Sequence, residues 1–273
     1  MSLRSVAELA ALVPDGARLA VAKDESGVAM AVARALIARG ARGLQLVTVP
    51  VSGLEADMLI GAGCIASLET SGITLAEFGQ APCFSRAVKA GTIQLKDATC
   101  PAIYAGLQAA QKGIPFMPLR GILETDVLAN RADWKVIDNP FAPGDRIVVL
   151  PAIEPDVALF HVPLADRFGN VFIGRQRELM LLAHASKSTL VSAERISEGN
   201  LLDDEARSGS VIPSLYITAV AHAPRGAWPL AFGDEYGTDA AWMASYVSEA
   251  RTEAGFERVL RSLAEHPGAR LAA

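Results

Sequence analysis

The chain has 273 residues, 51% of them apolar, which is enough to bury a large core, and we expect one folded body spanning residues 1–273. Its formal net charge is −5 with acidic and basic residues interspersed, which argues against a face that binds nucleic acid or an anionic membrane. No run approaches the roughly 20 apolar residues of a membrane span, so we expect a soluble, cytoplasmic protein.

Short β-branched runs alternate with longer helical patterns along the chain, which predicts βαβ units and a mainly parallel sheet. A buried strand is predicted over Arg18–Ala22, followed by a helix over Ala29–Ile37 that Gly40 ends. Leu44–Val49 supplies the next strand. Gly61–Gly63 is interpreted as a helix stop, because a helical segment precedes it and a strand follows, the reverse of a dinucleotide-binding loop.

The remainder of the chain continues the alternation of strands and helices. Strands are predicted at Ile93–Leu95, Arg146–Leu150, Val157–Val162 and Thr189–Ala193, and helices at Ala102–Gln111, Arg175–Ala185, Ala240–Ala250 and Ala254–His266. Prolines and glycines mark irregular stretches at Asn139–Asp145 and His222–Gly237, which are typical of loops that carry binding functions on a rigid sheet.

Two carboxylates follow predicted strands. Asp97 lies just past one strand and before a helix start, so its side chain can project from the C-terminal edge of the sheet as a catalytic group. An ordinary Asp that satisfies free N–H groups near a helix start is the alternative. Glu25 follows the first strand and is either a nucleophile or a solvated acidic residue in the first turn of a helix that begins at Ser26.

An arginine stands in a stiffened segment further along. Arg120 belongs to the proline-containing stretch Pro115–Gly121, where a rigid backbone can hold a guanidinium in place to meet a carboxylate or phosphate through two hydrogen bonds. A salt bridge between strands explains the residue equally well.

Several kinds of site lack their usual motifs. The sequence contains no GxSxG elbow, no HExxH and no P-loop, so hydrolase, zinc-protease and NTPase sites are not indicated and we expect no metal. The four scattered histidines, His161, His184, His222 and His266, are interpreted as structural or surface residues. Cys64, Cys83 and Cys100 form no CxxC pair, which predicts reduced, mostly buried thiols.

Segments in the second half of the chain match one known family. Gly113–Arg120 (GIPFMPLR) with Thr125-Asp126 is similar to a GLPFxPxR stretch, and Asp156–Val171 is similar to a DVALIH segment that continues into ADxxGNV. Leu190–Ile196 and Ile212–Ala227 match two later segments of the same proteins. Over most of residues 100–262 the chain therefore resembles the A (alpha) subunits of class I coenzyme A transferases of the glutaconate type.

The resemblance implies a fold and a reaction. It implies the fold of CoA transferases and ribose-phosphate isomerases, an open, mainly parallel sheet with helices on both faces. It also implies a B-type subunit whose glutamate is acylated while CoA passes between an acyl-CoA and a small carboxylic acid, with a CoA thioester as substrate and no permanently bound cofactor. That glutamate is not transferred to Glu25, because Glu25-Ser26-Gly27 runs into a helix predicted over Val28–Ala38 and not into a glycine-rich turn.

The chain departs from the resembled family just after the first strand. A-type subunits carry a Gly-Gly-Phe loop there, whose N–H groups stabilise an acyl oxyanion, whereas this chain has Val21–Gly27 without paired glycines. Loss of one such donor typically lowers turnover roughly 100- to 1,000-fold. We consider Lys23 a cationic substitute. Ser26 and Gly27 of the same turn, together with Arg120, are the other candidate substrate- or CoA-binding residues.

Three functions remain open on this basis. The leading one is the A-type subunit of a heteromeric CoA-transferase. The second is a subunit of a CoA-thioester-dependent, ring-cleaving hydrolase, in which an acidic residue upstream of the proline-containing stretch takes part and Asp97 is the nearest candidate. The third is a non-catalytic CoA-thioester-binding subunit. In each case we expect the ligand at the loops after Val21, Thr48 and Leu95, at the C-terminal ends of strands.

Overall fold

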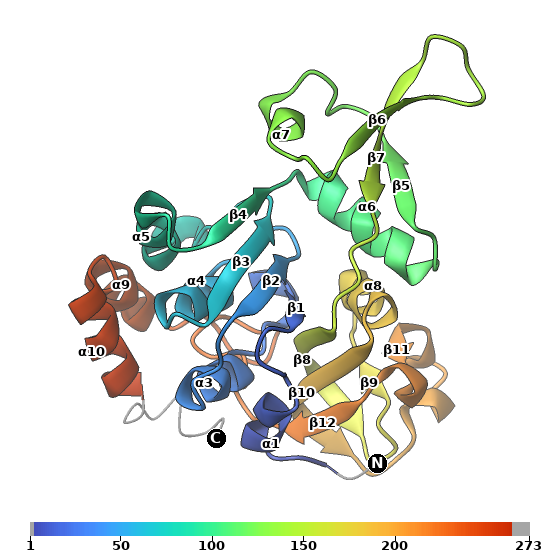
Figure 1. Cartoon of the computed structure of the whole chain (residues 1–273). Helices are drawn as coiled ribbons and strands as arrows, with labels where there is room; N and C mark the ends of the chain where they lie inside the picture. Colours follow the sequence, from blue (N-terminus) through green and yellow to red (C-terminus); the bar gives the residue numbers. More distant parts are fainter. Residues whose placement is uncertain (1–2, 264–273) are drawn as a thin grey trace.

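The structure is a computed structural model that describes residues 3–263. Within these residues the strands form a main sheet of nine strands and a separate sheet of three (Figure 1). The main sheet contains β1 (Arg18–Val21), β2 (Leu44–Thr48), β3 (Ile65–Thr70), β4 (Gln94–Asp97), β8 (Val157–Asp166), β9 (Val171–Phe172), β10 (Ser188–Ser197), β11 (Val211–Ile212) and β12 (Ala219–His222). Their order is β11-β9-β8-β1-β2-β3-β4, with β10 beside β8 and β12 beside β10.

Most neighbours in the main sheet run parallel. Only the pairs that involve β9 are antiparallel among the described strands of this sheet, namely β8 with β9 and β9 with β11. The register sets Val21 level with Thr48 on one side and Leu159 on the other, so β1 and β2 end together while β8 continues beyond them. The loops that follow β1, β2, β3 and β4 consequently lie along one edge of the sheet, which we call the rim.

Helices cover both faces of the main sheet because successive residues of a strand point to opposite sides. On β1, Leu19 and Val21 belong to one buried core, whereas Ala20 and the following Ala22 belong to a second core on the other face. The first core includes residues of α1 (Val6–Ala11), α3 (Met30–Ala38), α4 (Leu54–Gly61), α5 (Pro82–Ala90), α9 (Ala240–Glu249) and α10 (Glu253–Leu263). The second includes residues of α6 (Cys100–Gln111) and α8 (Arg177–Ala185). This is the open, mainly parallel α/β sheet that we expected.

A smaller part of the fold, which we call the lobe (residues 116–151), projects beyond the main sheet. It consists of β5 (Phe116–Leu119), α7 (Asp126–Ala129), β6 (Lys135–Asp138) and β7 (Arg146–Pro151), with β7 antiparallel to both β5 and β6 (Figure 1). Arg131 ties the lobe to the main sheet. Its guanidinium lies 2.7 Å from Glu69 Oε1 on β3 and donates to the carbonyl of Asp97, and its side chain is 3% exposed.

The expected elements are confirmed in type, with small shifts of their ends. The strand predicted at Ile93–Leu95 begins one residue later and ends two residues later, so Asp97 is the last residue of β4 and does not follow the strand. The helix Ala254–His266 is α10 up to Leu263, and its predicted end lies outside the described residues. Gly61 ends α4 and β3 follows, as predicted for Gly61–Gly63.

One prediction about the first turn is wrong. We expected Glu25-Ser26-Gly27 to run directly into a helix over Val28–Ala38, but a separate single-turn helix, α2 (Asp24–Gly27), stops at Gly27. Gly27 has φ of +116°, which lies outside the helical region, and Val28 is extended before α3 begins at Met30. This break leaves Lys23–Gly27 as a discrete turn on the rim.

The fold also bears on the predictions about the cysteines and about membrane spans. Cys64 and Cys83 are buried free thiols, and Cys100 is a free thiol that is exposed. Among the described residues, no helix combines the length and the apolar character that crossing a membrane requires.

Candidate active site

Four side chains meet at the rim between β1 and α8, and we call them the rim cluster (Lys23, Ser26, Gln176, Glu178). Lys23 Nζ lies 3.3 Å from Glu178 Oε1, and the Ser26 hydroxyl donates to the same oxygen. The Gln176 side-chain amide donates to the carbonyl of Glu25 at 3.2 Å and so fixes the turn from the other direction. The ammonium of Lys23 is thereby held at the rim by a carboxylate whose own position is fixed.

The charge state of Glu178 suits this holding role. Burial acts to raise its pKa, but the hydrogen bond from Ser26 and the charge of Lys23 outweigh burial and hold the pKa below its ordinary value. Its side chain is 13% exposed, whereas that of Lys23 is 29% exposed. Lys23 is therefore the member of this ion pair that a ligand can reach more easily.

Asp24 follows Lys23 in the chain, but it is bound by α4, which lies on the face of the main sheet opposite to α8. Its carboxylate accepts hydrogen bonds from the N–H groups of Gly53 and Leu54 at the start of α4, at 2.9 and 3.1 Å. A Cβ at position 53 would stand 2.3 Å from Asp24 Oδ2, so the close approach requires glycine there. Burial raises the pKa of Asp24 to about 7 in spite of these two bonds.

A second buried carboxyl group lies close to Asp24. Glu55 on α4 is fully buried, and neither carboxylate oxygen has a well-aligned hydrogen bond among the described residues. Burial and the charge of Asp24 raise the pKa of Glu55 well above its ordinary value, although the nearby N–H of Ala29 acts in the other direction. Burial at this position therefore favours the neutral form of the Glu55 carboxyl group.

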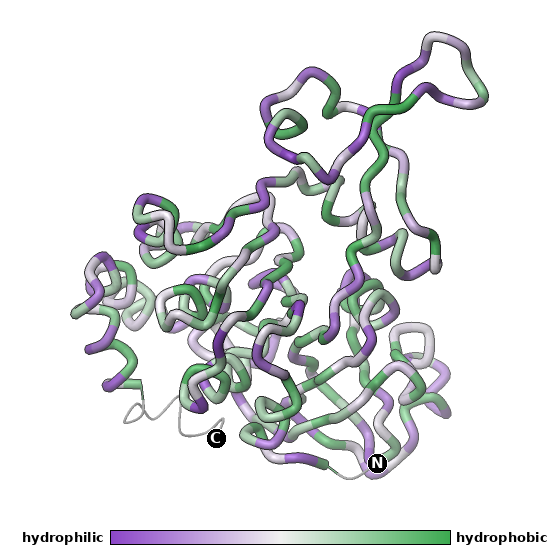
Figure 2. Tube along the Cα trace, in the orientation of Figure 1, coloured by the Kyte–Doolittle hydropathy of each residue, from purple (hydrophilic) through white to green (hydrophobic). Residues whose placement is uncertain are grey.

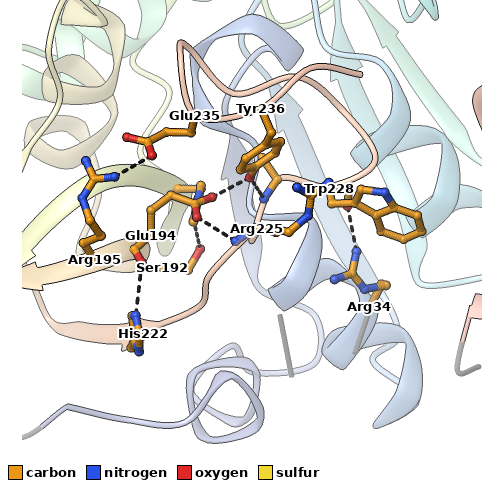
Figure 3. A network of polar contacts seen from close by, with 11 residues as sticks. Arg34, Ser192, Glu194, Arg195, His222, Arg225, Trp228, Glu235 and Tyr236 are labelled. Atoms are coloured by element: carbon orange, nitrogen blue, oxygen red, sulfur yellow. Dashed lines mark hydrogen bonds and ion pairs between the residues drawn. The ribbon is translucent and has the colours of Figure 1, made fainter. Parts of the chain in front are cut away.

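A network of polar contacts surrounds Glu194 (Figure 3). Glu194 on β10 accepts hydrogen bonds from His161 Nε2 at 2.8 Å, from the Tyr236 hydroxyl at 2.5 Å and from the Arg225 N–H at 2.7 Å. The other imidazole nitrogen of His161 bonds the Ser192 hydroxyl at 2.8 Å. Burial lowers the pKa of His161, with Glu194 acting against that effect.

This network reaches the rim through the backbone of His161. A Cβ at Gly27 would stand 2.1 Å from the His161 carbonyl oxygen, and one at Gly226 would stand 2.5 Å from the His161 ring. The Phe232 ring packs on the His161 ring at a centroid distance of 4.7 Å. His161 is buried and makes structural contacts, in line with the interpretation from the sequence. Its backbone carbonyl limits how closely the Lys23–Gly27 turn can approach β8.

Three of the predicted residues, Lys23, Ser26 and Gly27, lie together in the turn after β1. Glu25 is in the same turn, but its side chain makes no hydrogen bond among the described residues. Asp97 lies on the same rim at the end of β4, and its exposed carboxylate likewise makes no hydrogen bond or ion pair within residues 3–263.

Arg120 is separate from this group. It lies on the lobe, where its two terminal guanidinium nitrogens, Nη1 and Nη2, donate to the two carboxylate oxygens of Asp145 at 2.5 Å. This ion pair holds the pKa of Asp145 down to about 2. The structure thus favours the salt-bridge interpretation of Arg120, although the pair joins the residue after β5 to the residue before β7 and not two strand residues.

Sequence reasoning missed Glu178 and Gln176. Both fall at the start of the predicted helix Arg175–Ala185, and Glu178 is an acidic residue in its first turn, which alone suggests only a favourable helix-end charge. Their sequence separation of about 150 residues from Ser26 gave no hint of contact. Within the described residues, no group of three or more His, Cys, Asp or Glu side chains could hold a metal ion.

Comparison with known proteins gives a consistent family. The family model described as Coenzyme A transferase matches residues 3–223. The chain is 30% identical over 230 residues to the protein named as the A subunit of glutaconate CoA-transferase of Acidaminococcus fermentans, covering 76% of this chain and 69% of that one. It is 28% identical over 242 residues to the cholesterol ring-cleaving hydrolase IpdA subunit of Rhodococcus jostii, covering 84% and 80%.

One relative is much longer. An uncharacterised protein of Archaeoglobus fulgidus is 30% identical over 231 residues, which cover 84% of this chain and 51% of that protein. The chain therefore spans about half the length of this relative.

Two solved structures share the fold. A variant of the decarboxylase AibA/AibB superposes with a TM-score of 0.85 at 28% identity, covering 97% of this chain and 98% of the other. The glutaconate coenzyme A-transferase of Acidaminococcus fermentans gives a TM-score of 0.90 at 23% identity, covering 96% and 88%.

Proposed function

The chain belongs to the coenzyme A transferase family, and we propose that it is the A-type subunit of a heteromeric enzyme that exchanges CoA between an acyl-CoA and a small carboxylic acid. A B-type subunit supplies the nucleophilic glutamate, and the CoA thioester is a substrate, not a permanently bound cofactor. Residues 1–273 act as one unit in the cytoplasm, where thiols such as Cys64 and Cys83 stay reduced.

The observation that carries the proposal is the position of the Lys23 ammonium on the rim. Acyl transfer from a thioester places negative charge on the carbonyl oxygen, and a preorganised donor near that oxygen lowers the barrier. Lys23 lies just after β1, is held by Glu178 and remains partly exposed. It supplies a charge-assisted donor at the place where the resembled subunits carry backbone N–H groups of paired glycines.

The state of Glu178 also supports a nucleophile that comes from a partner subunit and not from this glutamate. Glu178 already accepts from Ser26 and Lys23, so its carboxylate is occupied in holding the turn. Its lowered pKa further weakens it as a nucleophile. A nucleophilic carboxylate approaching the rim from a second subunit would meet the thioester beside Lys23.

A panel assay tests the proposal. The chain is co-expressed with a B-type CoA-transferase chain from the same genome, the complex is purified, and CoA exchange is measured for short-chain acyl-CoAs with mono- and dicarboxylic acids. Exchange that is lost when the catalytic glutamate of the B-type chain is replaced supports the function. A stable complex that transfers no CoA across the panel overturns it.

A second candidate is a CoA-thioester-dependent hydrolase. The name of the Rhodococcus jostii relative and the absence of paired glycines in Val21–Gly27 favour it. Asp97 is its candidate acid or base, since its carboxylate is exposed on the rim and unengaged by the described residues. If Asp97→Asn leaves the hydrolysis of a cyclic acyl-CoA unchanged, Asp97 is not the acid or base. If the complex exchanges CoA and hydrolyses no acyl-CoA, the hydrolase candidate is excluded.

A third candidate, a subunit that binds CoA thioesters without catalysis, makes a distinct prediction. Titration calorimetry of the complex would show acyl-CoA binding without turnover, whereas both enzymatic candidates require turnover.

A further inference from the structure

The loop that follows β12 carries an arginine in an unusual backbone conformation. The apolar strand leads into this loop (Figure 2), and Arg225 there has φ of +56°, in the left-handed region that favours glycine. Its N–H donates to Glu194 Oε2 at 2.7 Å, and its guanidinium carbon lies over the Tyr236 ring, 4.7 Å from the centroid (Figure 3). Because the Tyr236 hydroxyl donates to the same carboxylate, Glu194 fixes both the backbone of Arg225 and the ring beneath its guanidinium.

A second arginine is attached to the same turn. The Trp228 N–H donates to the carbonyl of Arg225 at 2.9 Å, and the Trp228 carbonyl accepts from Arg34 Nη1 on α3, also at 2.9 Å. The guanidinium carbon of Arg34 lies 5.7 Å from the centroid of the Trp228 ring. Burial lowers the pKa of Arg34 to about 10, with Tyr236 acting in the other direction. We call Arg34 and Arg225 the arginine pair.

The carboxylates around the arginine pair are bonded to other groups. Glu194 is engaged by the network described above. Asp239 accepts a hydrogen bond from Trp228 Nε1 at 3.2 Å and caps α9. Glu235 pairs with Arg195 at 2.5 Å. Within residues 3–263, neither guanidinium of the arginine pair forms an ion pair, so a ligand would have to bring the negative charge.

The unbonded donors of the arginine pair are accessible. Both side chains are half-buried, and among the described residues the buried polar side-chain atoms that lack a partner belong to Glu55. The guanidinium nitrogens that make no hydrogen bond therefore reach the molecular surface. A planar guanidinium presents its donors in a fork that matches two oxygens of a phosphate or a carboxylate. Strained backbone that its surroundings hold in place, as at Arg225, is also concentrated at ligand-binding sites.

Contacts place the loop after β12 next to the turn that carries Lys23. β12 runs parallel to β10, β10 to β8 and β8 to β1, so the loops after β12 and β1 leave the sheet at the same edge. A Cβ at Gly226 would stand 2.5 Å from the His161 ring, and one at Gly27 would stand 2.1 Å from the His161 carbonyl oxygen. Ligands of parallel sheets bind at this edge. An acyl-CoA, whose phosphates are distant from its thioester, is long enough to contact both loops.

We propose that the arginine pair binds an oxyanion group of the substrate, either a phosphate of the CoA moiety or the carboxylate of the acid. Arg225 makes the direct contact, and Arg34 adds positive charge beside it. The identity of the substrate rests on the proposed function, whereas the affinity of the arginine pair for an oxyanion can be measured without any turnover.

The test measures ligand affinity by titration calorimetry, on the full chain and on its complex with the B-type chain. The probes are CoA, 3′-dephospho-CoA, succinate and pantetheine, of which pantetheine carries neither phosphate nor carboxylate. Arg225→Gln removes the charge, and Arg225→Lys keeps the charge without the planar fork. Arg251→Gln, at an exposed position between α9 and α10, is the control. Circular dichroism and thermal melting establish that each variant is folded.

We expect Arg225→Gln to weaken the binding of at least one anionic probe roughly 10- to 100-fold and Arg225→Lys to weaken it less, with the control changing it less than about threefold. A loss confined to CoA assigns the 3′-phosphate, and a loss shared by CoA and 3′-dephospho-CoA assigns the diphosphate. A loss confined to succinate assigns the carboxylate.

The remaining outcomes overturn the inference. Unchanged affinity of folded Arg225→Gln for every anionic probe removes the site and leaves the proposed function standing. An equal loss for pantetheine assigns the effect to a disturbed fold and not to an oxyanion contact. Wild-type protein that binds none of the probes, alone or in the complex, overturns the proposed function and the inference together.

Discussion

Gly27 lies against the backbone carbonyl of His161 so closely that a Cβ on Gly27 would stand 2.1 Å from that oxygen. The contact joins the turn that carries Lys23 to the buried hydrogen-bond network around Glu194. The position of the candidate active-site turn therefore depends on a residue that has no side chain.

Gly27→Ala should lower both stability and activity. The methyl group meets backbone that cannot move independently, and φ of +116° strains any L side chain, so we expect a loss of about 2–4 kcal/mol in the free energy of unfolding. Gly63→Ala is the matched control, because Gly63 also has positive φ but has open space around it, and should lose about 1 kcal/mol. Urea titration measures both, and equal losses would contradict the close contact.

Lys23→Met should lower kcat for CoA exchange about 100- to 1,000-fold, because it removes the proposed oxyanion donor. Stability should change by less than about 1 kcal/mol, since the ion pair with Glu178 is partly exposed. Lys112→Met, at an exposed position at the end of α6, serves as the control. Steady-state kinetics of the complex provides the measurement, and full activity of Lys23→Met would remove Lys23 from the site.

Glu55→Gln should flatten the pH dependence of stability. Burial raises the pKa of Glu55 in the folded state, so the unfolded chain releases its proton first as pH rises and wild-type stability falls above about pH 4.5. Asp24 acts in the same direction up to its pKa of about 7. The variant should therefore be more stable than wild type at pH 8 by more than the roughly 0.5 kcal/mol typical of surface changes.

Urea denaturation at pH 5, 6.5 and 8 measures this effect, with Glu205→Gln on the surface as the control. A variant whose free energy of unfolding falls between pH 5 and pH 8 as steeply as that of wild type would contradict a raised pKa of Glu55.

Glu194 and Arg195, neighbours on β10, should differ sharply in how much each contributes to the free energy of unfolding. Glu194→Ala removes the acceptor of the buried His161 and of the partly buried Tyr236, so we expect a loss of about 3 kcal/mol or more. Arg195→Ala breaks an ion pair with Glu235 whose side chains are 56% and 30% exposed, which should cost less than about 1 kcal/mol. Thermal melts of the two variants side by side test the contrast, and similar losses would show that the network is not the main support.

The fold was largely predictable because its signals are local. The periodicity of apolar residues predicts the strand Arg18–Val21 and the helix that follows it. The glycine at position 61 correctly predicts where α4 ends. The short α2 was not predicted. It ends at Gly27, which packs against the backbone of His161, and nothing in the local sequence indicates that approach to a residue 134 positions away by numbering. The lobe was missed for a similar reason, since its three strands pair with one another across a loop-rich segment.

The candidate site was predictable only in part. Lys23, Ser26 and Gly27 follow a strand, and the C-terminal ends of parallel strands meet at one edge, so their grouping followed from local sequence. Glu178 and Gln176 come from a distant helix and the residue before it, and nothing in their own neighbourhood connects them to Ser26. Arg120 was singled out because it lies in the proline-containing stretch Pro115–Gly121. In the structure its guanidinium forms an ion pair with Asp145 on the lobe and does not reach the rim.

Lys23 and Asp24 are adjacent in the chain, but they bind helices on opposite faces of the main sheet. Lys23 pairs with Glu178 on α8, and Asp24 accepts a hydrogen bond from Gly53 at the start of α4. Deleting one amino acid before this pair would move Asp24 to the place of Lys23 and present a carboxylate to Glu178 in place of an ammonium, whereas adding one would move Lys23 to the place of Asp24 beside the start of α4. An exchange of residue type at constant length therefore disturbs the contacts of this turn less than a change of its length does. Homologous chains that differ in the length of this turn should have replaced the contacts on both layers at once.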